Sequence, residues 1–489
     1  MRIIGNNPAA DNAEITAIAS GTLPNGKPVI VNSDGTVSAV GLTSVSQAIG
    51  SPAVFESADT TFTSSTFDSN SNKVVIAYSD GGNSSYGTAV VGTVSGTSIS
   101  FGTPVVYESG ATYYIVCTFD SNLNKVVIAY RDSDNSSYGT AVVGTVSGTA
   151  ISFGTPVVFE SASVSSKGIT FDSNLNKVVI AYSDAGNSGY GTAIVGTVSG
   201  TSISFGSPVV FASADTQNVS TTFDSASNKV VIAYRDVGND NYGTAIVGTV
   251  SGTAISFGSE AVFESGFTPG TSCTFDSNSN KVVIVYPANP SSFGQNYGHA
   301  VVATVSGTSI SFGTPVVYES ANTYDGNSAT FDSLSNKVVI AYTDGGNSSY
   351  GTVIVGTVSG TNISFGSPAV FESASSTYIS TAFDSSSNRV VIAYRDVGNS
   401  NYGTSVVFRN AASVTNLTAE NFIGFANGAA SDTGTARVQI GSAINGAQSS
   451  LTAGQQYFVQ TDGTIGLTAA DPSVIAGTAV SATNLIVKG

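Results

Sequence analysis

Acidic side chains recur at one position of a repeated loop, and this spacing raises the question of metal chemistry. Each of these aspartates is followed three residues later by asparagine: Asp80, Asp132, Asp184, Asp236, Asp344 and Asp396. Carboxylate and amide oxygens are the ligands that calcium prefers. An aspartate can also cap its own turn by accepting backbone N–H groups, which explains the repetition without an ion. We therefore expect turn capping, with no metal and no cofactor; calcium remains the alternative.

A second set of candidates lies in the segments where the repeats differ most from one another. These segments read "ADTTFTSS", "GATYYIV", "ASVSSKGI", "ADTQNVS" and their equivalents, and they supply Phe62, Tyr113, Tyr114, Lys167, Gln217, Tyr324 and Tyr378. Exposed tyrosines suit sugar rings or protein patches, because each offers a large apolar face and a hydroxyl at low entropic cost. We predict a binding site there. The alternative is that these residues pack over the mouth of a channel.

Three arginines stand just before the loop aspartate: Arg131, Arg235 and Arg395. The loop "SDGGNSSYGT" resembles the Asp-box, a structural turn of sialidase propellers, and sialidases gather three arginines around a carboxylate. However, the aspartates and most glutamates here belong to every repeat, whereas catalytic residues should be exceptions to it. We expect no catalytic residue and no enzymatic activity; a glycan-cleaving enzyme is a less favoured alternative.

The cysteines and the histidine fit the repeat without special chemistry. Cys117 and Cys273 fill one small-residue position in two different repeats, which predicts buried free thiols. His299 replaces a threonine of the repeat, so a metal or catalytic role is not expected.

Seven repeats must position these residues. The triplet "FDS" begins at successive steps of 52, 52, 52, 52, 56 and 52 residues: Phe67, Phe119, Phe171, Phe223, Phe275, Phe331 and Phe383. A fixed period of this size is typical of a solenoid, a propeller or an array. Each repeat predicts four strands, which we call A ("TTFDS"), B ("KVVIAY"), C ("GTAVVGTVSG") and D ("SISFGTPVVFES").

Strand B and the chain ends favour a closed propeller. Both alternating sets of "KVVIAY" are apolar, so this strand should be buried on both faces, and no helical segment is available to cover it. Neighbouring blades of a propeller would cover it. The last repeat lacks strand D, whereas "SQAIGSPAVFES" at residues 46–57 precedes the first strand A. We predict an all-β fold: a seven-bladed β-propeller closed by an N-terminal strand in the last blade, plus a small C-terminal β domain.

The domain organisation follows from these boundaries. Residues 1–45 form an N-terminal hairpin or anchor, 46–410 the propeller, and 411–489 the small C-terminal domain. We call the end of the blades that carries the D-to-A and B-to-C connections the top face, and the opposite end the bottom face. The two flanks leave from the bottom and could pack together there. The two flanks also contain a similar short sequence, "VIVNSDGTV" at 29–37 and "YFVQTDGTI" at 457–465.

Composition excludes several classes of partner. The formal net charge is −16, and only 10% of the residues are charged. A phosphate backbone needs a basic patch, so nucleic acid is not an expected partner. No apolar run is long enough for a membrane helix, and the first residues do not predict a signal peptide.

Nearly the whole chain resembles virion-associated repeat proteins of marine tailed bacteriophages such as cyanophages. The head "SGTLPNGKPVIVNSDGTVSAVG", the repeats and the tail "TAENFIGFANGAASDTGTARVQIG" carry this resemblance, and the tail is its most specific element. The resemblance implies a structural virion protein, a fibre, appendage or capsid decoration, made in the host cytoplasm. It supplies no catalytic motif.

We therefore expect a structural virion protein whose flanks contact other virion proteins. Its propeller would bind host-surface polysaccharide or protein through the top face. The alternative is a passive capsid or tail decoration or connector without receptor binding; a bacterial adhesin is less favoured. A homo-oligomer is compatible with the sequence, although no coiled-coil stretch indicates one.

Overall fold

The computed structural model describes residues 13–289, 296–323 and 326–488. It is all-β and divides into two compact units. Unit 1 comprises Met1–Ser46 and Ala411–Gly489, and unit 2 comprises Gln47–Asn410. In the part of the chain that the structure describes, no helix is long and apolar enough to cross a bilayer.

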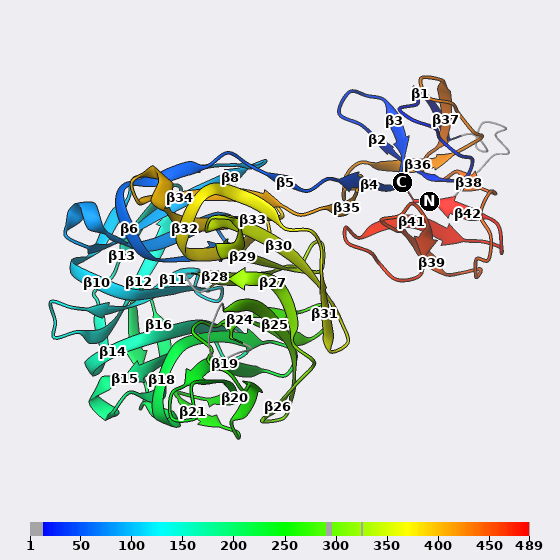
Figure 1. Ribbon diagram of the computed structural model, residues 1–489. Coiled ribbons are helices and arrows are strands. Elements are labelled where there is room, and N and C mark those ends of the chain that lie inside the picture. The colour runs from blue at the N-terminus through cyan, green and yellow to red at the C-terminus, as the bar shows by residue number, and fades with distance from the viewer. Residues whose placement is uncertain (1–12, 290–295, 324–325, 489) are drawn as a thin grey trace. The chain divides into compact units, whose positions relative to one another are not determined.

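Unit 2 repeats one group of antiparallel strands, which can be followed in chain order in Figure 1. In the second group, the last part of β10 (Val105–Asp120) pairs with β11 (Lys125–Asp132), and β11 pairs with β12 (Tyr138–Ser147). The other edge of β12 pairs with the short β13 (Ala150–Phe153) and then with the first part of β14 (Val157–Asp172). One long strand thus ends one group and begins the next. We call such strands crossover strands.

The remaining elements follow this pattern. The other crossover strands are β6 (Ala53–Asp68), β18 (Val209–Asp224) and β32 (Ala369–Asp384), and two are divided, into β22 (Ala261–Glu264) with β23 (Ser272–Asp276) and β27 (Val316–Asn322) with β28 (Asn327–Asp332). The B strands are β7 (Lys73–Asp80), β15 (Lys177–Asp184), β19 (Lys229–Asp236), β24 (Lys281–Ala288), β29 (Lys337–Asp344) and β33 (Arg389–Asp396). The C strands are β8 (Tyr86–Ser95), β16 (Tyr190–Ser199), β20 (Tyr242–Ser251), β25 (Tyr297–Ser306), β30 (Tyr350–Ser359) and β34 (Tyr402–Arg409). The short outer strands are β5 (Ala48–Ile49), β9 (Ser98–Phe101), β17 (Ser202–Phe205), β21 (Ala254–Phe257), β26 (Ser309–Phe312) and β31 (Asn362–Phe365). Short 3-10 turns follow four B strands: η1 (Gly81–Asn83), η2 (Ala185–Asn187), η3 (Gly345–Asn347) and η4 (Val397–Asn399).

The two-sided burial predicted for strand B is confirmed. Val74 to Tyr78 are all at most 1% exposed. One face packs on the next group, because Val75 and Ala77 share a core cluster with Val126 and Ile128 of β11. A strand covered by sheets on both sides is continuously apolar, which is why the alternation disappears in "KVVIAY".

A tyrosine at the end of strand B is fully buried in each group, and its hydroxyl reaches a glutamate. Tyr182 donates a hydrogen bond to Glu160 Oε2 at 3.0 Å. In one group alanine replaces that glutamate at Ala212, and Tyr234 donates instead to Glu260 at 2.7 Å. Because a buried hydroxyl without a partner is costly, these bonds explain why glutamate recurs in "FES".

Acidification is expected to stabilise unit 2. Burial raises the pKa of four of these carboxyls above the ordinary value, namely Glu56, Glu160, Glu319 and Glu372. A raised folded-state pKa means that the folded protein binds more protons than the unfolded chain while the pH falls through that pKa. The stabilisation is complete below the unfolded pKa and is lost as the pH rises through the folded one. We expect the urea midpoint of unit 2 to rise as the pH falls from neutrality toward the ordinary carboxyl pKa of 4.5. A midpoint that falls over this range contradicts the burial of these carboxyls.

The turns between strands A and B owe their uniformity to backbone geometry. Asp68 is 2% exposed, and its Oδ1 accepts the N–H groups of Asn70 and Ser71 at 2.9 and 3.0 Å. Asn72 then takes a φ of +54°, a left-handed conformation that asparagine tolerates. The same aspartate and asparagine recur in every group, so "DSNSNK" is a framework signal.

The first and last groups of unit 2 are joined by pairing. β34 pairs with β5, with Phe408 opposite Ile49, and with the first part of β6, with Thr404 opposite Val54. A core cluster includes Tyr78 and Ile76 from the first group and Val391 and Val407 from the last. Each crossover strand contacts the next, and β32 contacts β6.

Unit 1 contains both flanks of the chain, which were predicted as two separate segments, residues 1–45 and 411–489. The strands are β1 (Glu14–Ile18), β2 (Pro28–Val31), β3 (Val37–Ala39), β4 (Leu42–Val45), β35 (Ala412–Thr415), β36 (Phe422–Ala426), β37 (Thr435–Gln439), β38 (Ile444–Asn445), β39 (Gln456–Val459), β40 (Ile465–Gly466), β41 (Val474–Ala479) and β42 (Leu485–Val487). One sheet has the order β1-β37-β36-β2-β3, so two tail strands lie between head strands within it. A second sheet, β38-β42-β41-β39-β40, comes from the tail alone.

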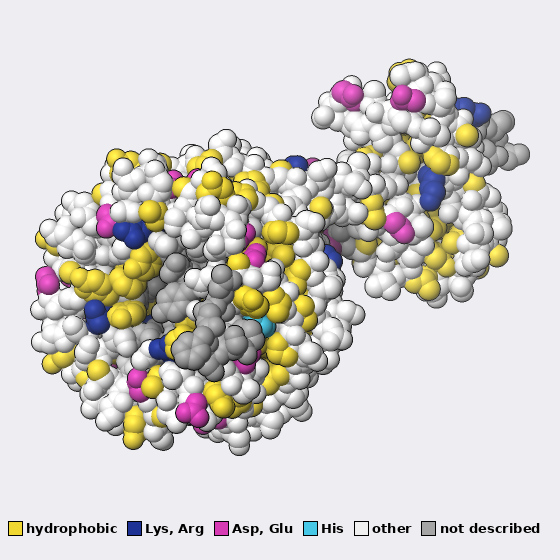
Figure 2. Space-filling model, viewed as in Figure 1, with side chains coloured by type: hydrophobic (Ala, Val, Ile, Leu, Met, Phe, Trp, Pro, Cys, Tyr) yellow, Lys and Arg dark blue, Asp and Glu magenta, His cyan; other side chains and the backbone are white. Residues whose placement is uncertain are grey.

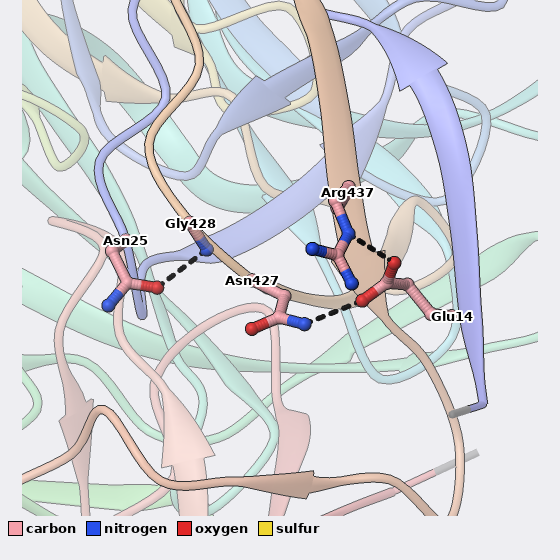
Figure 3. Close-up of polar contacts among 5 residues, drawn as sticks. All are labelled: Glu14, Asn25, Asn427, Gly428 and Arg437. Atoms are coloured by element: carbon pink, nitrogen blue, oxygen red, sulfur yellow. Dashed lines mark hydrogen bonds and ion pairs between the residues drawn. The ribbon is translucent and has the colours of Figure 1, made fainter. Parts of the chain in front are cut away.

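Side chains also tie the head to the tail (Figure 3). Glu14 accepts hydrogen bonds from Arg437 Nε at 2.5 Å and from Asn427 Nδ2 at 2.6 Å, while the N–H of Gly428 donates to Asn25 Oδ1 at 2.7 Å. The first sheet and both core clusters of unit 1 therefore need residues from both flanks.

The similar short sequences of the two flanks build the same turn twice. Asp34 Oδ1 accepts from the N–H and hydroxyl of Thr36 at 3.0 and 2.6 Å. Asp462 Oδ1 accepts from Thr464 in the same way, at 2.9 and 2.6 Å. The hairpin predicted around Asp34 is confirmed, because β2 pairs with β3 across it.

Candidate functional site

The variable D-to-A segments were expected to be connecting loops at the top face. This is wrong for most groups, because the crossover segments are continuous strands with a β-bulge. In β10, the pairing with β11 shifts register between Tyr113 and Val116. The residue inside the bulge has positive φ in five groups: Phe62, Tyr114, Ser166, Asn218 and Tyr378, at 46° to 53°. The equivalent residues of the two divided crossovers are Gly270 and Gly326. A bulge turns a side chain away from the regular alternation, so it can direct these residues to one place.

Four of the predicted site residues are brought together in one aromatic cluster. The ring of Phe62 lies at its centre, with centroid distances of 5.6 Å to Tyr113, 5.3 Å to Tyr114 and 5.1 Å to Tyr378. All four side chains are half-buried. They come from β6, β10 and β32, the crossover strands of the joint between the last and first groups. We call this set the aromatic cluster.

Two cations converge on the aromatic cluster. The guanidinium carbon of Arg131 lies 4.9 Å from the ring centroid of Tyr113 and 4.8 Å from that of Tyr114. Lys167 Nζ lies 5.6 Å from the Tyr114 centroid. Both positions allow cation–π attraction. Lys and Arg side chains are sparse on the face drawn in Figure 2, so two basic groups beside one aromatic cluster are unusual for this protein.

Lys167 is the most constrained member of the predicted set. Its side chain is 6% exposed, and Nζ is buried without a hydrogen-bond partner among the described residues. Burial, with the nearby charge of Arg131, lowers the pKa of this amine well below its ordinary value. A buried, unpaired amine is costly, and proteins retain such groups mostly where they act.

A cavity of about 300 Å³ opens beside these residues, between the crossover strands. Its lining includes bulge residues from five consecutive groups: Tyr114, Ser166, Asn218, Gly270 and Gly326, together with Lys167. This volume is at the lower end of the range for small-molecule pockets, about 300–1,000 Å³. Both polar and apolar groups line it, as a saccharide site requires.

The other predicted residues have separate surroundings. Gln217 Nε2 donates to Asp215 Oδ2 at 3.0 Å, and its Oε1 accepts from Arg235. Tyr324 lies outside the described residues. Phe267, which the sequence analysis did not select, is 41% exposed, and the Arg235 guanidinium lies 5.1 Å from its ring. Its position in the variable segment "GFTPGTS" was the signal that could have found it.

The three arginines do not form a carboxylate clamp. Arg131 lies over tyrosine rings, Arg235 contacts Gln217 and Phe267, and Arg395 pairs with Asp59 at 2.8 Å. Each therefore has its own neighbours, which removes the geometric basis for comparing them with the arginines of a sialidase.

The loop aspartates cap their own turns, as expected. Asp80 Oδ1 accepts the N–H of Gly82 at 2.9 Å, and Asp184 accepts that of Gly186 at the same distance. Within the described ranges, no group of three or more His, Cys, Asp and Glu side chains could hold a metal ion.

The cysteines and the histidine have structural surroundings. Cys117 and Cys273 are free and buried, as predicted, and burial raises the pKa of each thiol to about 12. His299 Nδ1 lies 2.9 Å from the carbonyl oxygen of Tyr297 and its ring stacks on Tyr286, whereas Thr192 bonds the equivalent carbonyl in another group.

No protein-family model and no curated protein matches the chain. Among solved structures, the BP39L lectin from Burkholderia pseudomallei matches with a TM-score of 0.53 at 11% sequence identity, covering 73% of this chain and 99% of the lectin. A leech intramolecular trans-sialidase matches with a TM-score of 0.44 at 10% identity, covering 75% of this chain and 70% of its own. An arginine-substituted mutant of AofleA from Arthrobotrys oligospora also gives 0.44 at 10% identity, covering 69% and 94%. The likeness to the BP39L lectin shows the fold alone: unit 2 has an all-β architecture of repeated strand groups, similar to that of a propeller lectin.

Proposed function

We propose that unit 2 is a closed, seven-bladed propeller. The pairing of β34 with β5 and β6 supports closure, because it gives the last group its outer strand. A serine hydroxyl also bridges neighbouring crossover strands: Ser64 accepts from the N–H of Cys117 at 3.0 Å, and Ser380 accepts from that of Ser65 at 2.8 Å. The second bond links the last group to the first, in the same way as the first bond links two groups that are consecutive in the chain.

The function that we propose is saccharide binding at the top face, without catalysis. One observation carries it: the aromatic cluster borders a cavity whose lining differs from group to group. Half-buried aromatic rings can pack on the apolar face of a sugar while their hydroxyls and neighbouring amides bond its polar edge. Framework needs would repeat in every group, whereas the position of Phe62, Tyr114 and Tyr378 holds no aromatic residue in the other four groups.

We further propose that the chain is a structural virion protein, with unit 1 as the part that contacts other virion proteins. Supporting this, described residues of both flanks share the core of unit 1, and unit 2 is a separate compact body. The chain would be made in the host cytoplasm and displayed on a phage particle. Antibody to unit 1 should label purified particles by immunogold microscopy; particles free of the chain would refute this role.

Binding of fluorescent protein to marine bacterial cells and their extracted polysaccharides tests the top-face proposal. We expect selective binding that falls about 10-fold or more in Tyr378→Ala, because an aromatic side chain that stacks on a ligand ring contributes about 1–3 kcal/mol in nucleic-acid sites and about 1.4 kcal/mol is tenfold in affinity. The matched control is Leu123→Ala, which removes a side chain that is 38% exposed in an A-to-B turn of the bottom face. Both variants should keep the wild-type melting temperature.

Two outcomes would contradict this proposal. If Leu123→Ala lowered the binding affinity as much as Tyr378→Ala does, recognition would not be specific to the top face. No binding to any host that the particle infects would favour the alternative, a passive capsid or tail decoration whose varied top face contacts other virion proteins.

A further inference from the structure

The region around Lys167 contains positive groups without a described counter-charge. Lys167 Nζ and Arg131 Nε are both buried and have no hydrogen-bond partner among the described residues. Lys167 lines the cavity, and no Asp or Glu is among the described residues that line it. Removing a cation from water without pairing it costs several kcal/mol, and the described residues do not offset that cost for these two groups.

The other described groups beside Lys167 do not supply a negative charge. Tyr114, from β10, presents its ring to the amine, and Arg131, from β11, adds a second positive charge. Ser166 and Asn218, which line the same cavity, are neutral. Two cations beside one ring, one of them lining a cavity whose other described walls are uncharged, are complementary to an anionic group held at the ring.

We propose that the cavity binds the acidic group of a saccharide, a carboxylate or a sulfate ester, with Lys167 as the residue that selects for charge. The inference rests on the proposed saccharide binding and names the substrate class of that same site. The sugar ring lies against the aromatic cluster, and its anionic group enters the cavity and bonds Lys167 Nζ. Arg131, held over Tyr113 and Tyr114, adds attraction from the side.

Binding an anion should also charge the amine. The lowered pKa of Lys167 favours the unprotonated amine in the free protein, whereas an anion beside Nζ favours the charged form. Ligand binding then takes up protons, and affinity falls as the pH rises through the pKa of the bound complex. Calorimetry in two buffers of different ionisation enthalpy measures this uptake.

The test uses the full chain and paired polysaccharides. Alginate and polygalacturonate are each compared with their carboxyl-reduced forms, and carrageenan with its desulfated form. We expect tighter binding of the acidic member in at least one pair. Lys167→Met should weaken that binding about 10- to 100-fold and leave the neutral partner unchanged, because a hydrogen bond to a charged group is lost. The pair that responds identifies a carboxylate or a sulfate.

Two controls separate binding from folding. Lys177→Met removes a lysine that bonds Thr197 at 3.0 Å on the bottom side of its group, and it should leave both affinities unchanged. Lys167→Met itself should keep or raise the melting temperature, because it removes an unpaired buried amine. A clear fall in its melting temperature would show that Lys167 has a structural partner and would overturn the proposal.

The remaining outcomes distinguish the two proposals. Equal binding of acidic and neutral members, or no change in Lys167→Met, overturns the charge selection and leaves saccharide binding intact. If none of these probes binds while host extracts still do, charge selection is again overturned. Loss of all binding, extracts included, overturns both.

Discussion

Tyr182→Ala is expected to lower the free energy of unfolding of unit 2 by about 3–5 kcal/mol, the range for deleting a large buried ring. Tyr182 is fully buried in the core between two strand groups, and its ring centroid lies 5.2 Å from that of Phe159. The deletion leaves a cavity between two sheets that the neighbouring groups hold in place. Urea unfolding followed by far-UV circular dichroism measures the change.

Tyr182→Phe is the matched control for this prediction. It keeps the ring and removes only the hydroxyl that donates to Glu160 at 3.0 Å, so we expect a loss of about 1 kcal/mol. Similar losses in the two variants would mean that the hydroxyl, and not the packing of the ring, stabilises this core.

Phe55→Ala is also expected to lower the free energy of unfolding of unit 2 by about 3–5 kcal/mol, although Phe55 lies where the first and last groups of unit 2 meet. Phe55 belongs to the part of β6 that pairs with β34. It is 6% exposed, and its ring lies 5.2 Å from Tyr78 and 5.7 Å from Phe101. If the ring of groups is closed, this joint should be as stable as any other.

Phe211→Ala provides the internal comparison. Phe211 is also 6% exposed, with the same distances of 5.2 and 5.7 Å to Tyr234 and Phe257. Closure predicts equal shifts of the urea midpoint in the two variants. A decrease in the free energy of unfolding below about 1 kcal/mol in Phe55→Ala alone would indicate that the first and last groups are not packed together, because truncating an exposed side chain changes stability little.

Strand B was predictable because its signal is local. Five consecutive apolar residues without helical neighbours require cover on both faces, and Val74 to Tyr78 have it. The A-to-B turn was equally readable, since Asp68 and Asn72 are the residue types that a capped turn with positive φ requires.

The crossover strands were misread because variability suggested loops. Segments such as "GATYYIV" remain extended and pair with both groups, and only a register shift at the bulge marks the change. A bulge leaves little trace in one sequence when tyrosine, serine and asparagine all occupy its left-handed position, as at Tyr114, Ser166 and Asn218. Two of the seven crossovers do break into separate strands, near Gly270 and Gly326.

Part of the candidate site was predictable, because residues that differ from the repeat are not required by the framework. This criterion selected Phe62, Tyr113, Tyr114 and Tyr378, whose rings form one cluster. The burial of Lys167 and its approach to Tyr114 depend on the bulge direction, which the sequence does not reveal. Likewise, the mixing of head and tail strands in unit 1 is a long-range pairing that no local pattern specifies.

Hydrogen–deuterium exchange, with and without the polysaccharide that binds most tightly, tests whether the top face binds saccharide. We expect slower exchange on binding at the bulges, in residues 62–64, 113–116 and 166–168, with no change in the A-to-B turns such as 69–72. Slower exchange confined to those turns or to unit 1, with the bulges unaffected, would contradict a saccharide site at the top face.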